Sequence, residues 1–208
     1  MINELMERYP CLSSCKEEIE TAAKALIECY KAGGKVLLCG NGGSCADCDH
    51  IVGELMKGFL KKRPLSDEKK AEMKSRCPEI EDDVLNKLQA ALPAVSLPSI
   101  TALNSAFCND VDPELIYAQP LMSLGRENDI LIALSTSGNS KNVFAAAKTA
   151  KALGVKVLGM TGKTGGKLKS LADICICVPE CETYKIQELH LPVYHYLCAT
   201  VEEYFFSE

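Results

Sequence analysis

The sequence predicts an α/β protein in which five parallel strands form a doubly wound sheet with helices on both faces. Five short, almost wholly apolar runs alternate with stretches of helical spacing, and this alternation is typical of parallel sheets that are buried on both sides. The chain has 208 residues, 47% of them hydrophobic, which is enough for a single domain over 1–208. The predicted strands are 35–39, 94–97, 129–134, 156–160 and 173–178.

Residues 1–32 predict N-terminal helices. Pro10 separates a short leading helix from a longer one, because proline inside a helix removes a backbone hydrogen bond. The longer helix covers 12–32, where apolar residues recur at helical spacing, and it ends before Gly33.

The most informative segment is the glycine turn at 40–44, Gly-Asn-Gly-Gly-Ser. It joins strand 35–39 to a helix predicted over 45–60, with Ser44 as its N-cap. Glycines allow positive φ and a close approach of the backbone, and the free amides at a helix N-terminus attract anions. The turn is therefore predicted to bind a phosphate or sugar oxygens.

Two side-chain pairs lie on the helix that follows this turn. His50 and Glu54 are four residues apart, so their side chains meet on one face. Such a pair is commonly a surface pair, but beside a candidate phosphate site it is typical of an enzyme. Cys45 and Cys48 form the one Cys-x-x-Cys of the chain; it is either a redox pair, a thiolate metal site or, most simply, packing.

Residues 61–92 differ in composition from the segments around them. A basic run, a charged amphipathic stretch, Pro78 and an acidic turn follow one another. We predict a helical insertion or lid of two helices, the second ending near Leu92. The segment is too short to bury a core of its own and is not a separate domain.

After strand 94–97, helices are predicted over 100–108 and 114–124. Asn109 and Asp110 stand at the break between them. Two polar side chains at such a break are candidates for contacts with a ligand.

The strand that ends at residue 134 opens into Ser-Thr-Ser-Gly-Asn-Ser at 135–140, before a helix over 141–153. Hydroxyls at a helix start suit a phosphate, although an ordinary N-cap with a turn gives the same pattern. A third loop covers 161–166, and the final helix covers about 184–206. Because carboxyl ends of parallel strands share one edge, loops 40–44, 135–140 and 161–166 are expected to meet there.

Composition and motifs exclude several classes of protein. The net charge of −5 argues against a nucleic-acid partner, because such binding depends on clustered basic residues. No stretch approaches the length of a membrane-spanning helix, and the N-terminus lacks the pattern of a secretion signal. Neither the ATP-type phosphate loop nor the dinucleotide-binding glycine motif is present. We therefore expect a cytoplasmic protein without a membrane partner.

The final helix carries Gln187, His190 and His195. Gln187 and His195 are eight residues apart, about 12 Å along an ideal helix. Their side chains converge only by reaching toward a point between them or if Pro192 bends the helix. Alternatively, Pro192 lies in the first turn of the helix and Gln187 precedes it.

Together these features resemble the sugar isomerase (SIS) domain family, and within it the phosphoheptose isomerases that act on sedoheptulose 7-phosphate. The resemblance spans nearly the whole chain in the family's order and implies the SIS fold. The matching pieces are 40–44, Asp47, His50, Glu54, Asn109, Asp110, 135–140, Thr161-Gly-Lys, Gln187-Glu-Leu-His190 and His195.

The resemblance implies a phosphorylated sugar as substrate and assigns roles residue by residue. Glu54 and His195 match the catalytic acid/base pair. Zinc is the implied cofactor, because four residues match the ligands of zinc-containing members: His50, Glu54, Gln187 and His195. The implied substrate-binding residues are Asn41, Gly42, Gly43, Ser44, Glu54, Asn109, Asp110, Ser135, Thr136, Ser137, Ser140 and Gln187.

The implied reaction is a ketose–aldose isomerisation of sedoheptulose 7-phosphate to D-glycero-D-manno-heptose 7-phosphate through an enediol. It needs a base, an acid and stabilisation of developing charge. The alternatives are a non-catalytic sugar-phosphate sensor or protein-binding adaptor, and an isomerase of another phosphosugar whose pocket is reshaped by 61–92. A related adaptor branch lacks the equivalents of Glu54 and His195, so their presence here favours the enzyme.

The resemblance also implies a homo-oligomer, in particular a tetramer, and the apolar stripe of helix 12–32 is a surface that another subunit could cover. Zinc is expected to depend on the histidines and not on the cysteines. On an ideal helix Glu54 lies within about 40° of His50, whereas Cys48 lies about 200° away from it.

Overall fold

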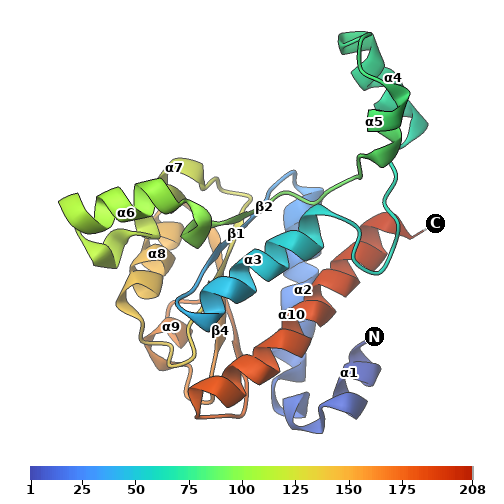
Figure 1. Cartoon of the computed structure of the whole chain (residues 1–208). Helices are drawn as coiled ribbons and strands as arrows, with labels where there is room; N and C mark the ends of the chain where they lie inside the picture. The colour runs from blue at the N-terminus through green and yellow to red at the C-terminus, as the bar shows by residue number, and fades with distance from the viewer. Residues whose placement is uncertain (208) are drawn as a thin grey trace.

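The computed structural model describes residues 1–207 and contains one sheet of five strands with helices on both faces (Figure 1). The spatial order is β2-β1-β3-β4-β5, and every neighbouring pair is parallel. The predicted fold class is confirmed, with each strand within a few residues of its expected place. The strands are β1 (Val36–Cys39), β2 (Ala94–Ser96), β3 (Ile130–Leu134), β4 (Lys156–Thr161) and β5 (Ile174–Cys177).

The chain changes direction across the sheet between β1 and β3. It passes from β1 to β2 on one side and then returns to β3 on the other side of β1, with Val36 opposite Ile130 and Cys39 opposite Ala133. The loops after β1 and β3 therefore lie next to each other at the carboxyl edge. Open α/β sheets bind their ligands at such a switch point.

Alternate side chains of the strands enter two separate cores. Val36 and Leu38 of β1 contribute to the core beneath one helical layer, and Leu37 and Cys39 to the core beneath the other. Strands buried on both faces read as continuous apolar runs for this reason. The first layer is α2 (Lys16–Lys31), α3 (Gly43–Met56) and α10 (Thr183–Phe206), with α1 (Ile2–Arg8) beside α10, and the second is α7 (Ala118–Leu124), α8 (Lys141–Ala152) and α9 (Gly166–Lys169) (Figure 1).

The predicted helix over 12–32 begins as a 3₁₀ turn, Pro10–Cys15, and continues as α2. Its apolar stripe, including Ile19, Ala22 and Leu26, is buried within this chain, where α2 packs on α10 and β5. The argument that the stripe is left for another subunit was therefore wrong, because the chain's own final helix covers it.

The ends of two site-bearing helices differ from expectation. α3 begins at Gly43 with Gly42 as its N-cap and ends at Met56, so the bounds 45–60 were displaced. Ser44 is not the N-cap but a buried residue of the first turn. α10 begins at Thr183 and contains Pro192 in its interior. Placing Pro192 in the first turn of the helix was therefore wrong.

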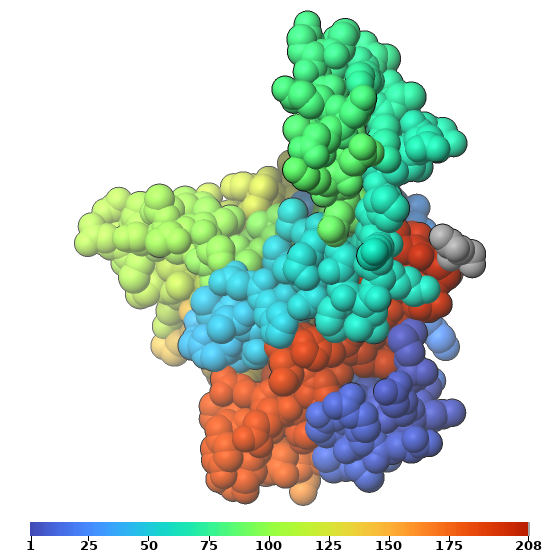
Figure 2. All heavy atoms as spheres, turned by 45° about the vertical axis from the view of Figure 1, so that its right-hand side comes forward, coloured from blue at the N-terminus to red at the C-terminus, as the bar shows by residue number. Residues whose placement is uncertain are grey.

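The insertion over 61–92 is helical, as predicted, and projects from the body (Figures 1 and 2). It consists of α4 (Asp67–Arg76) and α5 (Asp82–Lys87), so the second helix ends five residues before Leu92. Leu85 is the one buried residue of these two helices. The insertion is therefore an extended hairpin that stands away from the sheet in this structure.

A second projection is α6 (Thr101–Asp110), which follows the 3₁₀ turn Leu97–Ser99 and precedes another, Pro113–Leu115. None of its ten residues is buried, and it extends from the body on the side opposite to the insertion's base (Figure 1). Asn109 and Asp110 lie in the last turn of α6. The prediction that they stand at a break between two helices was therefore wrong.

No helix within residues 1–207 has both the length and the apolar character that a membrane span requires.

His190 on α10 gives the fold a defined pH dependence. It is fully buried, and its Nε2–H donates to the carbonyl of Thr161 at 3.3 Å. Burial lowers the pKa of His190 from 6.5 to about 4. Between these values the unfolded chain binds a proton that the folded chain does not, so stability falls as pH decreases through this window.

We predict that this one group makes the free energy of unfolding about 2 kcal/mol lower at pH 5 than at pH 7. Urea titrations of the wild type and of His190→Gln at both pH values test this. The difference between the two pH values should shrink by that amount in the variant. An equal pH dependence in the two proteins would contradict the assignment.

Candidate active site

The glycine turn requires its glycines at two positions. Gly42 has a φ of +57°, a conformation that residues with a side chain rarely adopt. A β-carbon on Gly40 would lie 2.8 Å from the carbonyl oxygen of Ser44. The backbone of the turn therefore folds closely over the first turn of α3, as expected of a loop that offers amides to a ligand.

Asn41 is held in place by a reciprocal pair of amides. Its Nδ2 donates to Oδ1 of Asn142 at 2.8 Å, and Nδ2 of Asn142 donates back at 2.9 Å. The Tyr117 hydroxyl lies 2.9 Å from Asn41 Oδ1 and 2.8 Å from the Gly40 carbonyl oxygen. Neither Tyr117 nor Asn142 is predicted as a site residue from the sequence. Asn142 lies two residues after the hydroxyl-rich loop, which was the one available signal.

The hydroxyl-rich loop 135–140 closes on itself at the start of α8. Ser135 Oγ donates to Ser140 Oγ at 3.0 Å. Gly138 has a φ of +66°, and a β-carbon there would lie 2.0 Å from the carbonyl oxygen of Gly165. The Gly162 amide donates to the Thr136 carbonyl at 2.9 Å. Loops 135–140 and 161–166 are therefore packed together, as the shared sheet edge predicts.

Helices α3 and α10 lie side by side (Figure 1) and run in the same direction. Near their N-termini, a β-carbon on Gly43 would lie 2.5 Å from Gln187 Nε2. Farther along, His50 meets Tyr194 and His195. Gln187 therefore lies at the glycine turn, eight residues before His195 on the same helix.

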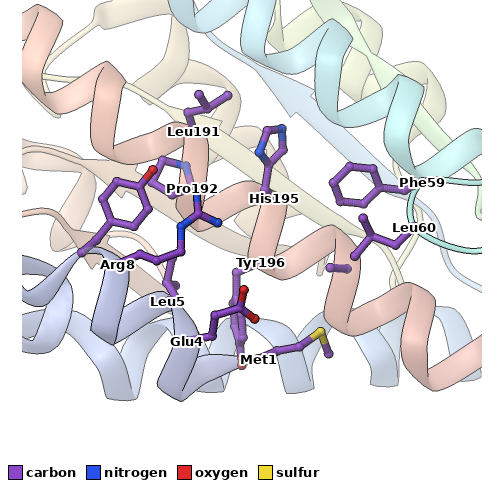
Figure 3. Close-up of a pocket in the computed structure, with 12 residues that line it drawn as sticks. Met1, Glu4, Leu5, Arg8, Phe59, Leu60, Leu191, Pro192, His195 and Tyr196 are labelled. Atoms are coloured by element: carbon purple, nitrogen blue, oxygen red, sulfur yellow. The ribbon is translucent and has the colours of Figure 1, made fainter.

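The structure brings together His50, Glu54 and His195. His50 Nε2 lies 3.1 Å from Glu54 Oε1, and the rings of His50 and His195 lie edge to face with centroids 5.0 Å apart. Phe59 also packs against His195, with ring centroids 5.5 Å apart. His195 also lines a cavity of about 500 Å³ between α1 and α10, together with Leu5, Arg8 and Tyr196 (Figure 3).

Two atoms of this cluster are buried and have no hydrogen-bond partner within the described part of the chain: Glu54 Oε2 and His195 Nε2. Lys57 Nζ is 3.8 Å from the former, beyond hydrogen-bond distance. Burial, followed by the charge of His50, lowers the pKa of His195. The His195 imidazole is therefore neutral at neutral pH and able both to accept and to donate a proton.

Tyr194 supports the cluster and was also missed by the sequence analysis. Its hydroxyl donates to Asp47 Oδ1 at 3.1 Å and lies 3.0 Å from His50 Nδ1. Burial raises the pKa of Asp47, and the hydrogen bond from Tyr194 partly opposes this shift. In the sequence Tyr194 cannot be told apart from the apolar residues of the last helix, because its role depends on hydrogen-bond partners from α3.

Asn109 and Asp110 are not brought to these residues within one chain. Asn109 Nδ2 donates to Asp110 Oδ1 at 2.7 Å, and both are exposed at the end of the projecting α6. Their predicted contact with the substrate thus lacks support from the geometry of a single chain.

The donor atoms suit zinc in kind, since imidazole and carboxylate are its usual ligands together with thiolate. Glu54 Oε2 and His195 Nε2 are atoms of this type that have no hydrogen-bond partner and could bind a metal ion. Across residues 1–207, however, no three His, Cys, Asp or Glu side chains are grouped so as to hold a metal ion. The contact of His50 Nε2 with Glu54 Oε1 takes up both atoms, and Gln187 lies at the turn.

Cys45 and Cys48 do not have the character of a redox pair. Burial raises the pKa of both thiols, and Cys48 is fully buried. A reactive pair at a helix N-terminus needs the opposite shift.

Comparisons with known proteins identify the family to which the chain belongs. Residues 2–90 and 102–198 each match the SIS domain. The phosphoheptose isomerase of Rhodospirillum rubrum is 38% identical over 192 residues, which cover 92% of this chain and 88% of that protein. The chain belongs to the SIS domain family. The phosphoheptose isomerase of Aneurinibacillus thermoaerophilus is 39% identical. The matched residues cover 90% of this chain and 82% of that protein.

Solved structures of the SIS domain family lead to the same grouping. The phosphoheptose isomerase from Neisseria gonorrhoeae superimposes with a TM-score of 0.76 at 29% identity, covering 97% of this chain and 94% of its own. The enzyme from Francisella tularensis gives 0.75 with the same identity and coverage. The predicted resemblance is confirmed.

A pair of glycine substitutions tests the loop geometry. Gly138→Ala is expected to lower the free energy of unfolding by at least about 2 kcal/mol, because φ is positive and the new carbon meets backbone. Gly53→Ala is the matched control: a β-carbon there meets nothing within 4 Å, and alanine should stabilise α3 by about 0.5–1 kcal/mol. Thermal unfolding measures both. Equal effects would contradict the packing of loop 135–140 on 161–166.

Proposed function

We propose that this chain is a phosphoheptose isomerase that converts sedoheptulose 7-phosphate to D-glycero-D-manno-heptose 7-phosphate. The observation that carries the proposal is that Glu54 Oε2 and His195 Nε2 are both buried without a hydrogen-bond partner, in a cluster where the His50 ring contacts both residues. Relatives of 34–39% identity over nearly the whole chain are phosphoheptose isomerases, and their name indicates the substrate.

The geometry suits an enediol mechanism. Glu54, as a carboxylate, takes a proton from C1 of the ketose and returns it to C2. His195, neutral at the start, delivers a proton to O2 and removes the proton from O1. A base on carbon and an acid on oxygen acting together avoid a free enolate.

The phosphate of the substrate would lie at the hydroxyl-rich loop. Ser135, Thr136, Ser137 and Ser140 surround the start of α8, where the helix amides and dipole favour an anion. The glycine turn, fixed by Asn142 and Tyr117, would face the sugar hydroxyls. The phosphate and the sugar hydroxyls would thus be held at the carboxyl edge of the sheet, at the switch point between β1 and β3.

Glu54→Gln should lower kcat by at least about 100-fold, because the amide cannot take the carbon proton. Turnover of sedoheptulose 7-phosphate, followed by detection of the aldoheptose phosphate, measures this. Glu188→Gln is the matched control on the exposed face of α10 and should turn over like the wild type.

The outcomes separate the candidate functions. If the Glu54→Gln variant is as active as the wild type, Glu54 has no role in the proposed mechanism. A wild type that binds sugar phosphates but converts none from a panel of phosphoketoses would favour the sensor. Conversion of another phosphoketose alone would make the enzyme an isomerase of different specificity.

We propose zinc as the cofactor, held by His50, Glu54, Gln187 and His195. Glu54 Oε2 and His195 Nε2, which have no hydrogen-bond partner, support this. To complete the site, the His50 side chain would have to move away from Glu54, and Gln187 would have to reach the other three ligands from its place at the glycine turn. When bound, zinc would polarise the substrate carbonyl. Carboxylate and imidazole supply the firm ligands, and the Gln187 amide oxygen is a weaker one.

Elemental analysis of purified proteins tests the zinc proposal. His50→Ala/His195→Ala should lose the metal, whereas Cys45→Ser/Cys48→Ser should keep it. Zinc lost from the cysteine variant alone would mean that the chain has a thiolate site in place of the proposed one.

We also propose a homotetramer in the cytoplasm, where a charged sugar phosphate is retained. Exposed apolar side chains surround the cluster, with Met56, Leu60 and Leu191 exposed by 48%, 67% and 40%, and another subunit would cover them. Light scattering at micromolar concentration should give four times the chain mass of 22.6 kDa. A monomer mass would contradict the proposal.

A further inference from the structure

A buried ion pair joins the end of α3 to α10 beside the catalytic cluster. The carboxylate of Glu202, on α10, accepts from Arg63 Nε at 2.7 Å. It also accepts the backbone amides of Phe59, Leu60 and Lys61 at 2.8, 2.7 and 3.1 Å. The Arg63 and Glu202 side chains are 0% and 1% exposed. One carboxylate thus fixes the whole turn that leaves α3.

Arg63 uses its remaining donors on the last carbonyls of α3. Nη1 donates to the Leu55 oxygen at 2.7 Å, and Nη2 to the Glu54 oxygen at 3.1 Å. The guanidinium also lies over the Phe206 ring, 4.6 Å from its centroid. Only a planar fork with several donors can make these contacts together.

The pair reaches both proton-transfer residues through the backbone. Arg63 holds the main chain of Glu54, and Glu202 holds the amide of Phe59, whose ring packs on His195. Glu202 itself lies seven residues after His195, two turns along the same helix. Stability alone is a poor reason for such a pair, because desolvation of two buried charges offsets much of their attraction.

We propose that Arg63 and Glu202 are positioning residues that set the distance and orientation between Glu54 and His195. This inference rests on the proposed isomerase function. Gly43 and Gln187 set the spacing of α3 and α10 at one end, and Arg63 with Glu202 sets it at the other. A displacement of about 1 Å between acid and base is enough to cost about 100-fold in rate.

The chain offers a matched control at the opposite edge of the sheet. Asp129 is buried and accepts the backbone amides of Lys35 and Arg126 at 2.9 and 2.8 Å, with Lys35 Nζ at 2.6 Å. Asp129→Asn therefore weakens a similar buried carboxylate, but one that touches neither α3 nor α10 through these bonds.

The kinetic test uses Arg63→Lys and the neutral double variant Arg63→Met/Glu202→Gln, so that one folded protein remains if the other fails to fold. Turnover is measured well below each unfolding temperature. We expect kcat to fall about 10- to 100-fold with KM changed by less than about threefold, because the phosphate loop is untouched. Asp129→Asn should lower the unfolding temperature and leave kcat within about twofold.

A second readout, NMR of ¹³C-labelled histidine, does not depend on activity. The chain has three histidines, so each ring carbon gives three signals. Replacing each histidine in turn shows which signal belongs to which residue. In both Arg63 variants the signals of His50 and His195 should move, while that of the buried His190 stays. Asp129→Asn should move none of the three.

Each outcome decides one proposal. Folded Arg63 variants with wild-type kcat and unmoved His50 and His195 signals would overturn the positioning role. A fall in kcat of equal size in Asp129→Asn would overturn it as well, because loss of stability would then explain both. A wild type without isomerase activity would instead defeat the proposed function, and the histidine signals would still report on the geometry.

Discussion

The close, parallel packing of α10 on α3 is the constraint on which the site depends. At one end the absence of a β-carbon at Gly43 lets Gln187 lie against the glycine turn. At the other end the buried pair of Arg63 and Glu202 ties the last turn of α3 to α10. Between these two contacts His50 and Glu54 from one helix face His195 from the other. A change in helix spacing would separate Glu54 from His195, the two groups proposed to transfer protons at adjacent atoms of the substrate.

The sheet provides the second requirement, a place for the substrate's anionic end. The strand order reverses between β1 and β3, so two helix N-termini, those of α3 and α8, stand next to each other at one edge. Their free backbone amides favour negative charge at this edge. This explains how a protein with a net charge of −5 can offer a site for a phosphorylated sugar.

Two elements do little for the core of the single chain. The α4–α5 hairpin buries one residue, and α6 buries none. Conformational entropy opposes such poorly buried helices, so their formation depends on local contacts such as the N-cap of Ser66 on Lys69. A surface that a second chain covers would stabilise both, and α6 carries Asn109 and Asp110, which the family resemblance assigns to the substrate.

Much of the fold follows from the order of residues alone. Apolar runs buried on both faces require parallel strands, and glycine turns and hydroxyl loops mark the carboxyl edge, because these patterns are local. The same holds for His50 and Glu54, since helical periodicity brings residues four apart onto one face. His195 could be assigned only through the resemblance, because its partners come from a segment about 145 positions away.

Tertiary structure decided the remainder. The close approach of Gln187, on a distant helix, to Gly43 at the start of α3 is a long-range contact. The burial of the α2 stripe likewise follows from α10 and not from another subunit. Tyr117, Tyr194 and Arg63 have no local signature, because each acts through a hydrogen bond to a residue far along the chain. The sequence by itself therefore determined the sheet, the loops and the chemical types present, while long-range packing determined which of these groups meet.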